Sequence, residues 1–207
     1  EQQMLRACLI TLIIALLLGA YLVYIGGWRI LLIGVFAIFF AWLYTATNHS
    51  LSYLGIADVF VLLFYGIIAG WGTGYLQVAP KMCPADLSCS LLWASAVNGL
   101  ISMCVLIINN LRDLDSDRTA GKRTFPVRFG KRAGEWGMAV IVLLMPVMAW
   151  LAFHAWLPML VIVPALVLLF CTLRAEGAQY NKCLLGAGLV NVCYVLLVLV
   201  LTTKSYL

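Results

Sequence analysis

The sequence predicts an all-α fold, a polytopic bundle of about seven transmembrane helices. Two observations predict it. First, 65% of the 207 residues are hydrophobic and only 10% are charged, whereas a soluble domain is about 45–50% apolar and about 25% charged. Second, apolar stretches recur along the whole chain, so one N-terminal signal peptide does not account for them. We therefore expect most helices to face lipid.

Seven apolar segments have the length of a membrane-spanning helix. The bilayer core takes about 20 helical residues, with a usable range of roughly 17–25. Transmembrane strands are excluded because the segments are long and no blocks of about ten residues alternate in polarity. No polar stretch is long enough to fold alone, so we expect one membrane domain over residues 1–207. The segments are Ala7–Ile25, Ile30–Ala46, Val59–Ala79, Leu87–Ile108, Trp136–Phe153, Trp156–Leu173 and Cys183–Thr203.

The connections are short except for Thr47–Asp58, which is uncharged until its last residue, and Asn109–Glu135, which carries seven of the thirteen Lys and Arg residues. Positively charged loops stay on the cytoplasmic side. This places the Asn109–Glu135 loop in the cytoplasm and the chain in the inner (plasma) membrane. The alternative interpretation is that these charges only set the topology.

The third segment carries glycine at every fourth position, at Gly66, Gly70 and Gly74. Small residues at this spacing let the backbones of two helices approach closely in lipid. We interpret the stripe as a packing face rather than as a binding site.

Three of the eight acidic residues, Asp113, Asp115 and Asp117, stand within five positions of the charged loop. If the fourth segment continues as a helix, Asn109, Asp113 and Asp117 share one face at the spacing i, i+4, i+8. Asp115 is rotated about 200° from Asp113 and points elsewhere. We therefore predict that Asp113 and Asp117 act together and that Asp115 does not.

The same polar face extends back into the bilayer through Ser102 and Asn98. Polar groups at membrane depth are costly unless they serve a function. This favours a site over the alternative, a solvated loop whose mixed charges merely repel lipid.

The two predicted carboxylates offer only oxygen, the ligand type that a hard cation such as Mg²⁺ prefers. Mg²⁺ takes one or two carboxylates and completes its shell with water and phosphate oxygens. The basic residues Arg112, Lys122 and Arg128 would bind the same phosphate oxygens, and Gly121 would let the chain turn closely around the anion. The loop is therefore predicted to be a magnesium–diphosphate site.

At these residues the sequence resembles the UbiA superfamily of intramembrane prenyltransferases, and within it the 1,4-dihydroxy-2-naphthoate polyprenyltransferases of menaquinone synthesis. Their second aspartate motif runs N-N-x-R-D-x-x-x-D-x-x-x-G-K-x-T and continues with V-R-x-G. Upstream, Tyr53–Gly66 resembles the family's Y-x-G-L-G-D block, with Ala57 where glycine is usual. The eleven positions that match the second motif are Asn109, Asn110, Arg112, Asp113, Asp117, Gly121, Lys122, Thr124, Val127, Arg128 and Gly130.

The main departure of the chain from the family pattern concerns the first aspartate motif. Family members have nine helices and two aspartate motifs, the first of N-D-x-x-D type between helices two and three. No second acidic cluster occurs in this sequence. The chain therefore resembles the C-terminal seven helices, and the domain is expected to be incomplete at its N-terminus.

The resemblance implies an enzyme that transfers a polyprenyl group from polyprenyl diphosphate to 1,4-dihydroxy-2-naphthoate, with loss of the carboxylate, to give demethylmenaquinone. Mg²⁺ and the basic residues would draw charge from the diphosphate as the C–O bond ionises. The expected partners are these two substrates and membrane lipid, with no nucleic acid. The implied catalytic residues are Asp113, Asp117, Lys122 and Arg112, of which the two aspartates bind metal, and the implied substrate-binding residues are Asn109, Asn110, Arg128, Asp58, Tyr53 and Thr124.

Two of the implied roles leave alternatives open. The aromatic residues Tyr53, Phe64 and Tyr65 would shield a prenyl cation with their ring faces, or they pack against helices and lipid. Asp58 would orient the aromatic acceptor, or it caps the helix that it begins.

Other function classes fit the sequence less well. A secondary transporter with intramembrane Asp and Asn would show inverted repeats, and none is visible in the sequence. A CDP-alcohol phosphotransferase needs an Asp-Gly pair before its spaced aspartates, and the chain has no Asp-Gly. A UbiA-type prenyltransferase with another aromatic acceptor is the nearest alternative, because the acceptor rests on analogy.

Overall fold

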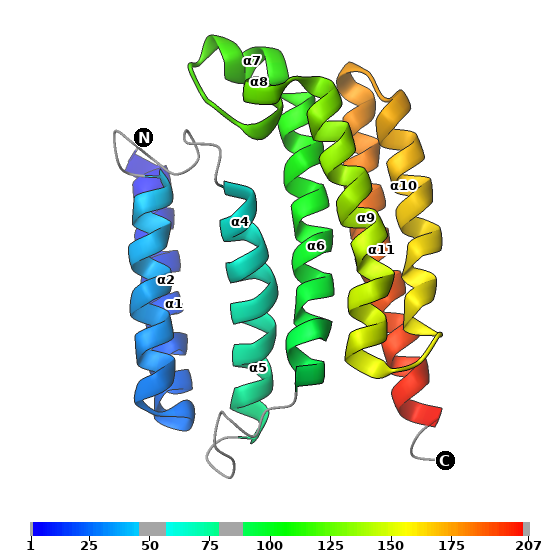
Figure 1. The fold of residues 1–207 in the computed structure, drawn as a ribbon. Coiled ribbons are helices and arrows are strands. Elements are labelled where there is room, and N and C mark those ends of the chain that lie inside the picture. The colour runs from blue at the N-terminus through cyan, green and yellow to red at the C-terminus, as the bar shows by residue number, and fades with distance from the viewer. Residues whose placement is uncertain (1, 46–56, 79–88, 205–207) are drawn as a thin grey trace.

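The computed structural model describes residues 2–45, 57–78 and 89–204. Over these ranges the chain forms helices joined by turns, without strands, as predicted (Figure 1). Tyr53, one of the predicted substrate-binding residues, lies outside the described residues. The elements are α1 (Gln2–Gly26), α2 (Trp28–Thr45), a rod made of α4 (Ala57–Val61), the π-helix η1 (Leu62–Ile68) and α5 (Ala69–Val78), α6 (Cys89–Arg112), α7 (Leu114–Thr119), α8 (Phe125–Phe129), α9 (Lys131–Phe153), η3 (Pro158–Val161), α10 (Ile162–Arg174), η4 (Gly177–Gln179) and α11 (Tyr180–Lys204).

The helices have the dimensions of a membrane bundle. Among the described residues five helices are long and apolar enough to cross a bilayer. Two shorter apolar helices, Trp28–Leu43 and Pro158–Arg174, stand where the second and sixth spans were predicted. The long helices run side by side, with the connections gathered at the two ends (Figure 1). The protein is a multi-pass integral membrane protein with the predicted all-α fold.

The charged loop is shorter than predicted because its flanking helices extend into it. The fourth span ends at Arg112 rather than at Ile108, and the fifth begins at Lys131 rather than at Trp136. Hydropathy locates only the part of a helix that lies in hydrocarbon, whereas backbone hydrogen bonding continues into the polar interface. The shortened loop carries the two short helices α7 and α8.

Helix α6 is central to the bundle and packs against the α4–η1–α5 rod, α9 and α11 (Figure 1). Its buried side chains Val97, Ile101 and Ile108 share one apolar core with Met138 and Val142 of α9. In lipid such helices are held by close packing, since lipid tails are as apolar as the side chains. This core supports the end of α6, where the charged loop begins.

The glycine stripe of the third span packs against α6, which confirms the prediction of a packing face. A Cβ atom added at Gly66 would lie 2.5 Å from the Cα atom of Gly99, and one added at Gly70 would overlap the side chain of Ser95. No larger residue permits this approach. Gly66 lies within η1, and π-helical turns inside α-helices are frequent at functional sites.

The hairpin of α1 and α2 touches the rest of the bundle through a few aromatic side chains. Tyr75 donates a hydrogen bond of 3.0 Å from its hydroxyl to the carbonyl of Gly26. Phe40 packs against Phe60 and Phe64, with ring centroids 5.2 and 5.5 Å apart. Most other described side chains of the hairpin are exposed, as expected of helices that face lipid.

Candidate functional site

The charged loop begins with a bend in the helix at Asp113. Helix α6 ends at Arg112, Asp113 has φ −95° and ψ 12°, and α7 follows directly. Helical hydrogen bonds continue across the bend. The Asp113 N–H donates to the carbonyl of Asn109 at 2.9 Å, and the Asp117 N–H donates to the carbonyl of Asp113 at 2.8 Å. Backbone hydrogen bonds of the helical i to i+4 type therefore link Asn109 to Asp113 and Asp113 to Asp117.

Asp113 is held by its neighbour Arg112. The guanidinium donates from Nε to Oδ1 at 2.8 Å and from Nη2 to Oδ2 at 2.9 Å, which makes a bidentate ion pair. These hydrogen bonds hold the pKa of the Asp113 carboxyl below its usual value of 3.8, and they outweigh the opposing effect of partial burial. The positive charges of Arg112 and Lys122 act in the same direction. Asp113 is therefore an anion throughout the neutral range.

Asp117 is the buried carboxylate of the loop. Its side chain is 6% exposed, and Lys122 donates from Nζ to its Oδ1 at 2.7 Å. The turn after α7 brings this pair together. The Lys122 N–H donates to the carbonyl of Asp117 at 3.0 Å and the Gly121 N–H to that of Arg118 at 3.2 Å, the Schellman ending of a helix. Gly121 has φ +73°, the left-handed backbone that this ending requires.

Asp115 differs from the other two aspartates. Its side chain is 96% exposed, and its ion pair with Arg118 is long, with 3.8 Å between Oδ1 and Nη1. This outward direction is the one that a rotation of about 200° along the helix predicted. A solvated pair of this kind adds little to stability or to a binding site.

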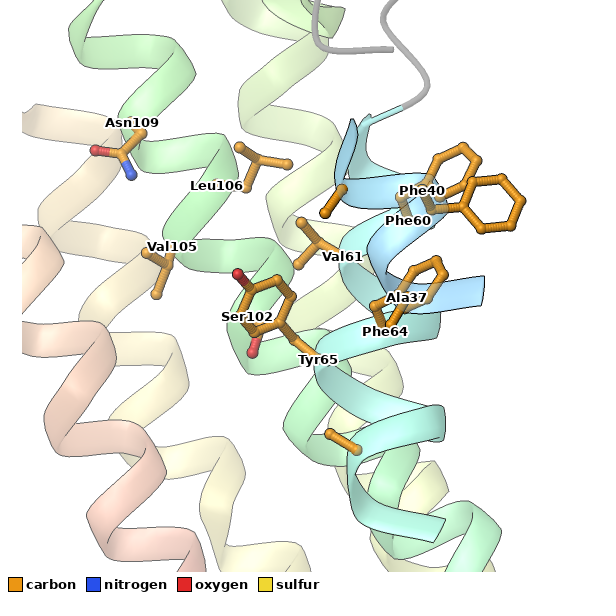
Figure 2. A pocket seen from close by; sticks show the side chains of 12 residues that line it. Ala37, Phe40, Phe60, Val61, Phe64, Tyr65, Ser102, Val105, Leu106 and Asn109 are labelled. Carbon is orange, nitrogen blue, oxygen red and sulfur yellow. The ribbon is translucent and has the colours of Figure 1, made fainter. Parts of the chain in front are cut away.

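A cavity of about 820 Å³ lies between α2, the α4–η1–α5 rod and α6. The α6 wall carries the polar side chains Ser102 and Asn109 (Figure 2). Because the Asn109 carbonyl accepts the backbone hydrogen bond of Asp113, this end of the cavity lies one helical turn from the acidic site. Two residues of the predicted polar face of α6 therefore line a largely apolar cavity, whereas Asn98 is not part of its lining. The aromatic wall opposite consists of Phe40, Phe60, Phe64 and Tyr65.

The remaining predicted residues have different environments. Asn110 and Thr124 are buried, and the Thr124 hydroxyl has no hydrogen-bond partner among the described residues. Arg128 is exposed on α8. Asp58 is half-buried in the first turn of α4, and within the described part of the chain its Oδ1 atom also has no partner. Among the residues that the structure describes, that oxygen makes no capping hydrogen bond. Buried polar atoms without partners are rare in folded proteins.

Asn181 is a residue of this site that the sequence did not indicate. Its side-chain oxygen accepts a hydrogen bond of 3.0 Å from Nη1 of Arg112, across 69 positions of the chain. The only sign of it in the sequence is a polar residue two positions before the last predicted span, Cys183–Thr203. The spacing of a motif gives no information about contacts between residues so far apart in the sequence.

The acidic residues suit Mg²⁺ rather than a metal held by protein ligands alone. Among the described residues, no group of three or more His, Cys, Asp or Glu side chains is placed to hold a metal ion. Mg²⁺ needs fewer protein ligands because it keeps several waters and takes phosphate oxygens. Asp113 and Asp117 are the carboxylates of the loop that could serve such an ion, and in the structure each is paired with a cation, Arg112 or Lys122.

The bundle and this loop together define a class of protein, a multi-spanning membrane protein whose charged site adjoins an apolar cavity. Residues 1–182 match the UbiA prenyltransferase family, and the chain belongs to this family. The resemblance that the second aspartate motif indicated is thereby confirmed.

Several named relatives share part of this chain. The 1,4-dihydroxy-2-naphthoate octaprenyltransferase of Escherichia coli (strain K12) is 37% identical over 137 residues, which are 63% of this chain and 42% of the relative. The protein of the same name from Mycobacterium tuberculosis is 32% identical over 129 residues, which are 62% of this chain and 42% of the relative. The 2-carboxy-1,4-naphthoquinone phytyltransferase of Synechocystis sp. is 31% identical over 108 residues, which are 52% of this chain and 33% of the relative.

The chain spans about two fifths of the length of the first two relatives. No solved structure matches the chain.

Proposed function

We propose that the full-length protein transfers a polyprenyl group from a polyprenyl diphosphate to 1,4-dihydroxy-2-naphthoate. The products would be carbon dioxide, diphosphate and the quinol form of demethylmenaquinone. One observation carries the proposal: two carboxylate–cation pairs follow, within two helical turns, the polar end of a large apolar cavity. A polyprenyl diphosphate has the same two parts, an anionic head and a long apolar tail.

The diphosphate would replace the carboxylates as the partner of the two cations. Arg112 and Lys122 each donate to an aspartate in the structure. Phosphate oxygens accept the same charge-assisted hydrogen bonds, and a guanidinium binds them in bidentate fashion. The exchange would leave Asp113 and Asp117 beside a polyanion, an arrangement that requires a bound cation.

Asp113 and Asp117 would hold Mg²⁺, which when bound neutralises negative charge on the diphosphate. The lowered pKa of Asp113 keeps its carboxyl ionised for this role. Arg112 and Lys122 would stabilise the charge that collects on the departing oxygen as the prenyl C–O bond breaks. The electron pair of that bond leaves with the diphosphate, and a ring carbon of the acceptor supplies the pair for the new C–C bond. The bond between the ring and the carboxylate would then break, and its electron pair would restore the aromatic ring as carbon dioxide leaves.

The cavity would hold the reacting end of the prenyl chain. The ring faces of Phe64 and Tyr65, which line it (Figure 2), attract a positive charge. Its apolar walls would also exclude water, which would otherwise capture the prenyl cation.

The proposed acceptor rests on the names of the relatives. Two of them name 1,4-dihydroxy-2-naphthoate, and the third names 2-carboxy-1,4-naphthoquinone with a phytyl donor. A naphthalene ring that carries oxygen substituents and a carboxyl group is common to these names. Asp58, whose Oδ1 has no partner among the described residues and which stands two positions before the cavity-lining Phe60, would accept a hydrogen bond from a hydroxyl of that ring.

The charged loop would face the cytoplasm. It carries seven of the thirteen basic residues, and cytoplasmic loops are enriched in Lys and Arg. In this orientation the diphosphate would be released into the cytoplasm. Residues 1–207 would act as part of one membrane domain of the inner membrane.

The test is magnesium-dependent prenyl transfer in membranes that contain the full-length protein. Labelled polyprenyl diphosphate and 1,4-dihydroxy-2-naphthoate are supplied, and the quinol product is measured with and without a chelator. We expect product only with Mg²⁺. Membranes that form no product but take up a solute through this protein would identify a transporter and overturn the proposal.

A further inference from the structure

Arg112 makes contacts with two separate elements. Its Nη1 atom donates to Oδ1 of Asn181 at 3.0 Å, while Nε and Nη2 donate to the carboxylate of Asp113. Arg112 is the last residue of α6, and Asn181 stands in the first turn of α11. The hydrogen bond therefore ties together the loop ends of two membrane-spanning helices.

The two contacts of Arg112 differ in charge. Asp113 neutralises the guanidinium, whereas the amide oxygen of Asn181 accepts a hydrogen bond and leaves the positive charge in place. Because the N–H donors of a guanidinium form a rigid fork, one fixed acceptor also sets the direction of the others. Asn181 therefore orients the fork without weakening its attraction for an anion.

The side chain of Asn181 is exposed, but it directly follows a buried residue in the first turn of α11. Its neighbour Tyr180 is 3% exposed and belongs to the apolar core. The turn before α11 is closed by a capping box between Glu176 and Gln179. An acceptor on such a support keeps its place when the partners of Arg112 change.

We propose that Asn181 is a positioning residue that holds Arg112 in place for the diphosphate when Asp113 turns from Arg112 to the bound cation. The inference rests on the proposed function, since diphosphate binding is what requires that exchange. Without Asn181, the exchange would leave Arg112 with none of the three side-chain hydrogen bonds that it makes within the described part of the chain. Its long side chain would then regain the rotamer freedom that binding has to remove.

The test measures the affinity of the full-length protein, in detergent, for inorganic diphosphate with Mg²⁺, by isothermal titration calorimetry. This readout does not depend on prenyl transfer. We expect Asn181→Ala to bind diphosphate about three- to tenfold more weakly, the effect of one hydrogen bond. Asn181→Asp should bind more weakly still, because it adds a negative charge, and Asn181→Gln should recover part of the loss. Lys182→Arg, which changes the exposed neighbour and keeps its charge, should bind like the wild type.

A double-mutant cycle separates positioning from general damage. In Arg112→Ala protein, removing the Asn181 side chain should change the affinity by less than about twofold, because its partner is already gone. Equal affinities of the wild type and Asn181→Ala would overturn the proposal, and so would an undiminished loss in the Arg112→Ala background. If Asn181→Ala does not fold, Asn181→Asp keeps the side-chain shape, and an affinity at or above the wild-type value overturns the proposal.

Failure of the proposed function would give a different result. If prenyl transfer were absent while diphosphate affinity depended on Asn181 through Arg112, the positioning role would stand and the reaction would be wrong. If prenyl transfer were present and every Asn181 variant bound diphosphate fully, the positioning role alone would be wrong.

Discussion

The ammonium of Lys122 lies 2.7 Å from Oδ1 of Asp117, a carboxylate that is 6% exposed. The left-handed turn at Gly121 brings the two residues together at the end of α7. The pair therefore belongs both to the proposed diphosphate site and to the local structure of the loop, so stability and activity should respond differently to substitutions at Asp117.

Asp117→Ala should abolish prenyl transfer and lower the free energy of unfolding by about 1–2 kcal/mol, because Lys122 loses this acceptor but is 38% exposed and keeps access to water. Asp117→Asn keeps an acceptor and should regain most of the stability without the activity. Thermal unfolding of the purified protein and prenyl transfer are measured in parallel. Wild-type activity in either variant would contradict the assignment.

Asp113→Ala should reduce prenyl transfer by at least about a hundredfold, as expected for loss of a ligand to the cation that neutralises charge on the diphosphate. Asp115→Ala should stay within about twofold of the wild type, because its side chain is 96% exposed and directed into solvent. Initial rates of prenyl transfer at saturating Mg²⁺ measure the effect of each substitution. An equally large loss in Asp115→Ala would show that the assignment of one helical face is wrong.

The ion pair of Arg112 and Asp113 should give the fold a pH-dependent stability. The pKa of Asp113 is lowered from 3.8 in the folded protein. The ionised carboxylate therefore stabilises the fold above the pKa of the unfolded chain, and this contribution is lost as the pH falls through the folded value. The difference in Tm between the wild type and Asp113→Asn should stay constant from neutral pH to about pH 5 and shrink below 3.8. Circular dichroism melts measure it, and a difference that grew in acid would contradict the pairing.

Gly66→Ala should destabilise the bundle by about 1–3 kcal/mol, the usual cost of overpacking, since its Cβ would meet the backbone of Gly99 at 2.5 Å. Gly72→Ala, on the same rod, is the matched control, because an added Cβ there has nothing within 4 Å. It should be neutral or slightly stabilising, as alanine favours helix over glycine. Unfolding in a denaturing detergent compares the two variants. Equal changes in the stability of the two variants would show that the glycine stripe does not constrain packing.

Ser102→Phe should fill part of the cavity and raise the KM for polyprenyl diphosphate, because the side chain lines the space proposed for the prenyl chain. The affinity of the Ser102→Phe protein for inorganic diphosphate should be unchanged, and this result also shows that the variant is folded. Val140→Phe, at a residue that is 55% exposed on α9, serves as the control for added bulk. A KM equal to that of the wild type would place the prenyl chain elsewhere.

The membrane explains why the fold could be predicted. A bilayer imposes the length and the apolar character of each span, so each of the seven predicted segments overlaps a helix over the described residues. The sixth begins at Pro158, in a 3-10 turn, rather than at Trp156. The ends of the helices could not be predicted in the same way. Residues such as Arg112 and Lys131 continue a helix by backbone hydrogen bonds in a region where hydropathy gives no signal.

The arrangement of the three aspartates could be predicted from the sequence, but the ion pairs that they form could not. Helical periodicity separated Asp113 and Asp117 from Asp115, and the structure keeps that separation. Which cation pairs with which aspartate depends on the turn at Gly121. The wall that α2 adds to the cavity and the contact of Arg112 with α11 depend on tertiary packing, on which local spacing carries no information.

The π-helical segment η1 (Leu62–Ile68) allows the α4–η1–α5 rod both to pack against α6 and to line the cavity. Gly66 faces Gly99 of α6, while Phe60 lines the cavity. A π-turn holds about one residue more than an α-turn, which rotates α4 relative to α5 by roughly 100°. Deleting one residue inside η1 would restore an ordinary α-helix and turn Phe60 away from the cavity. The number of residues in this segment, and not only their identity, therefore determines the shape of the cavity. Natural insertions and deletions in η1 should be rarer than substitutions.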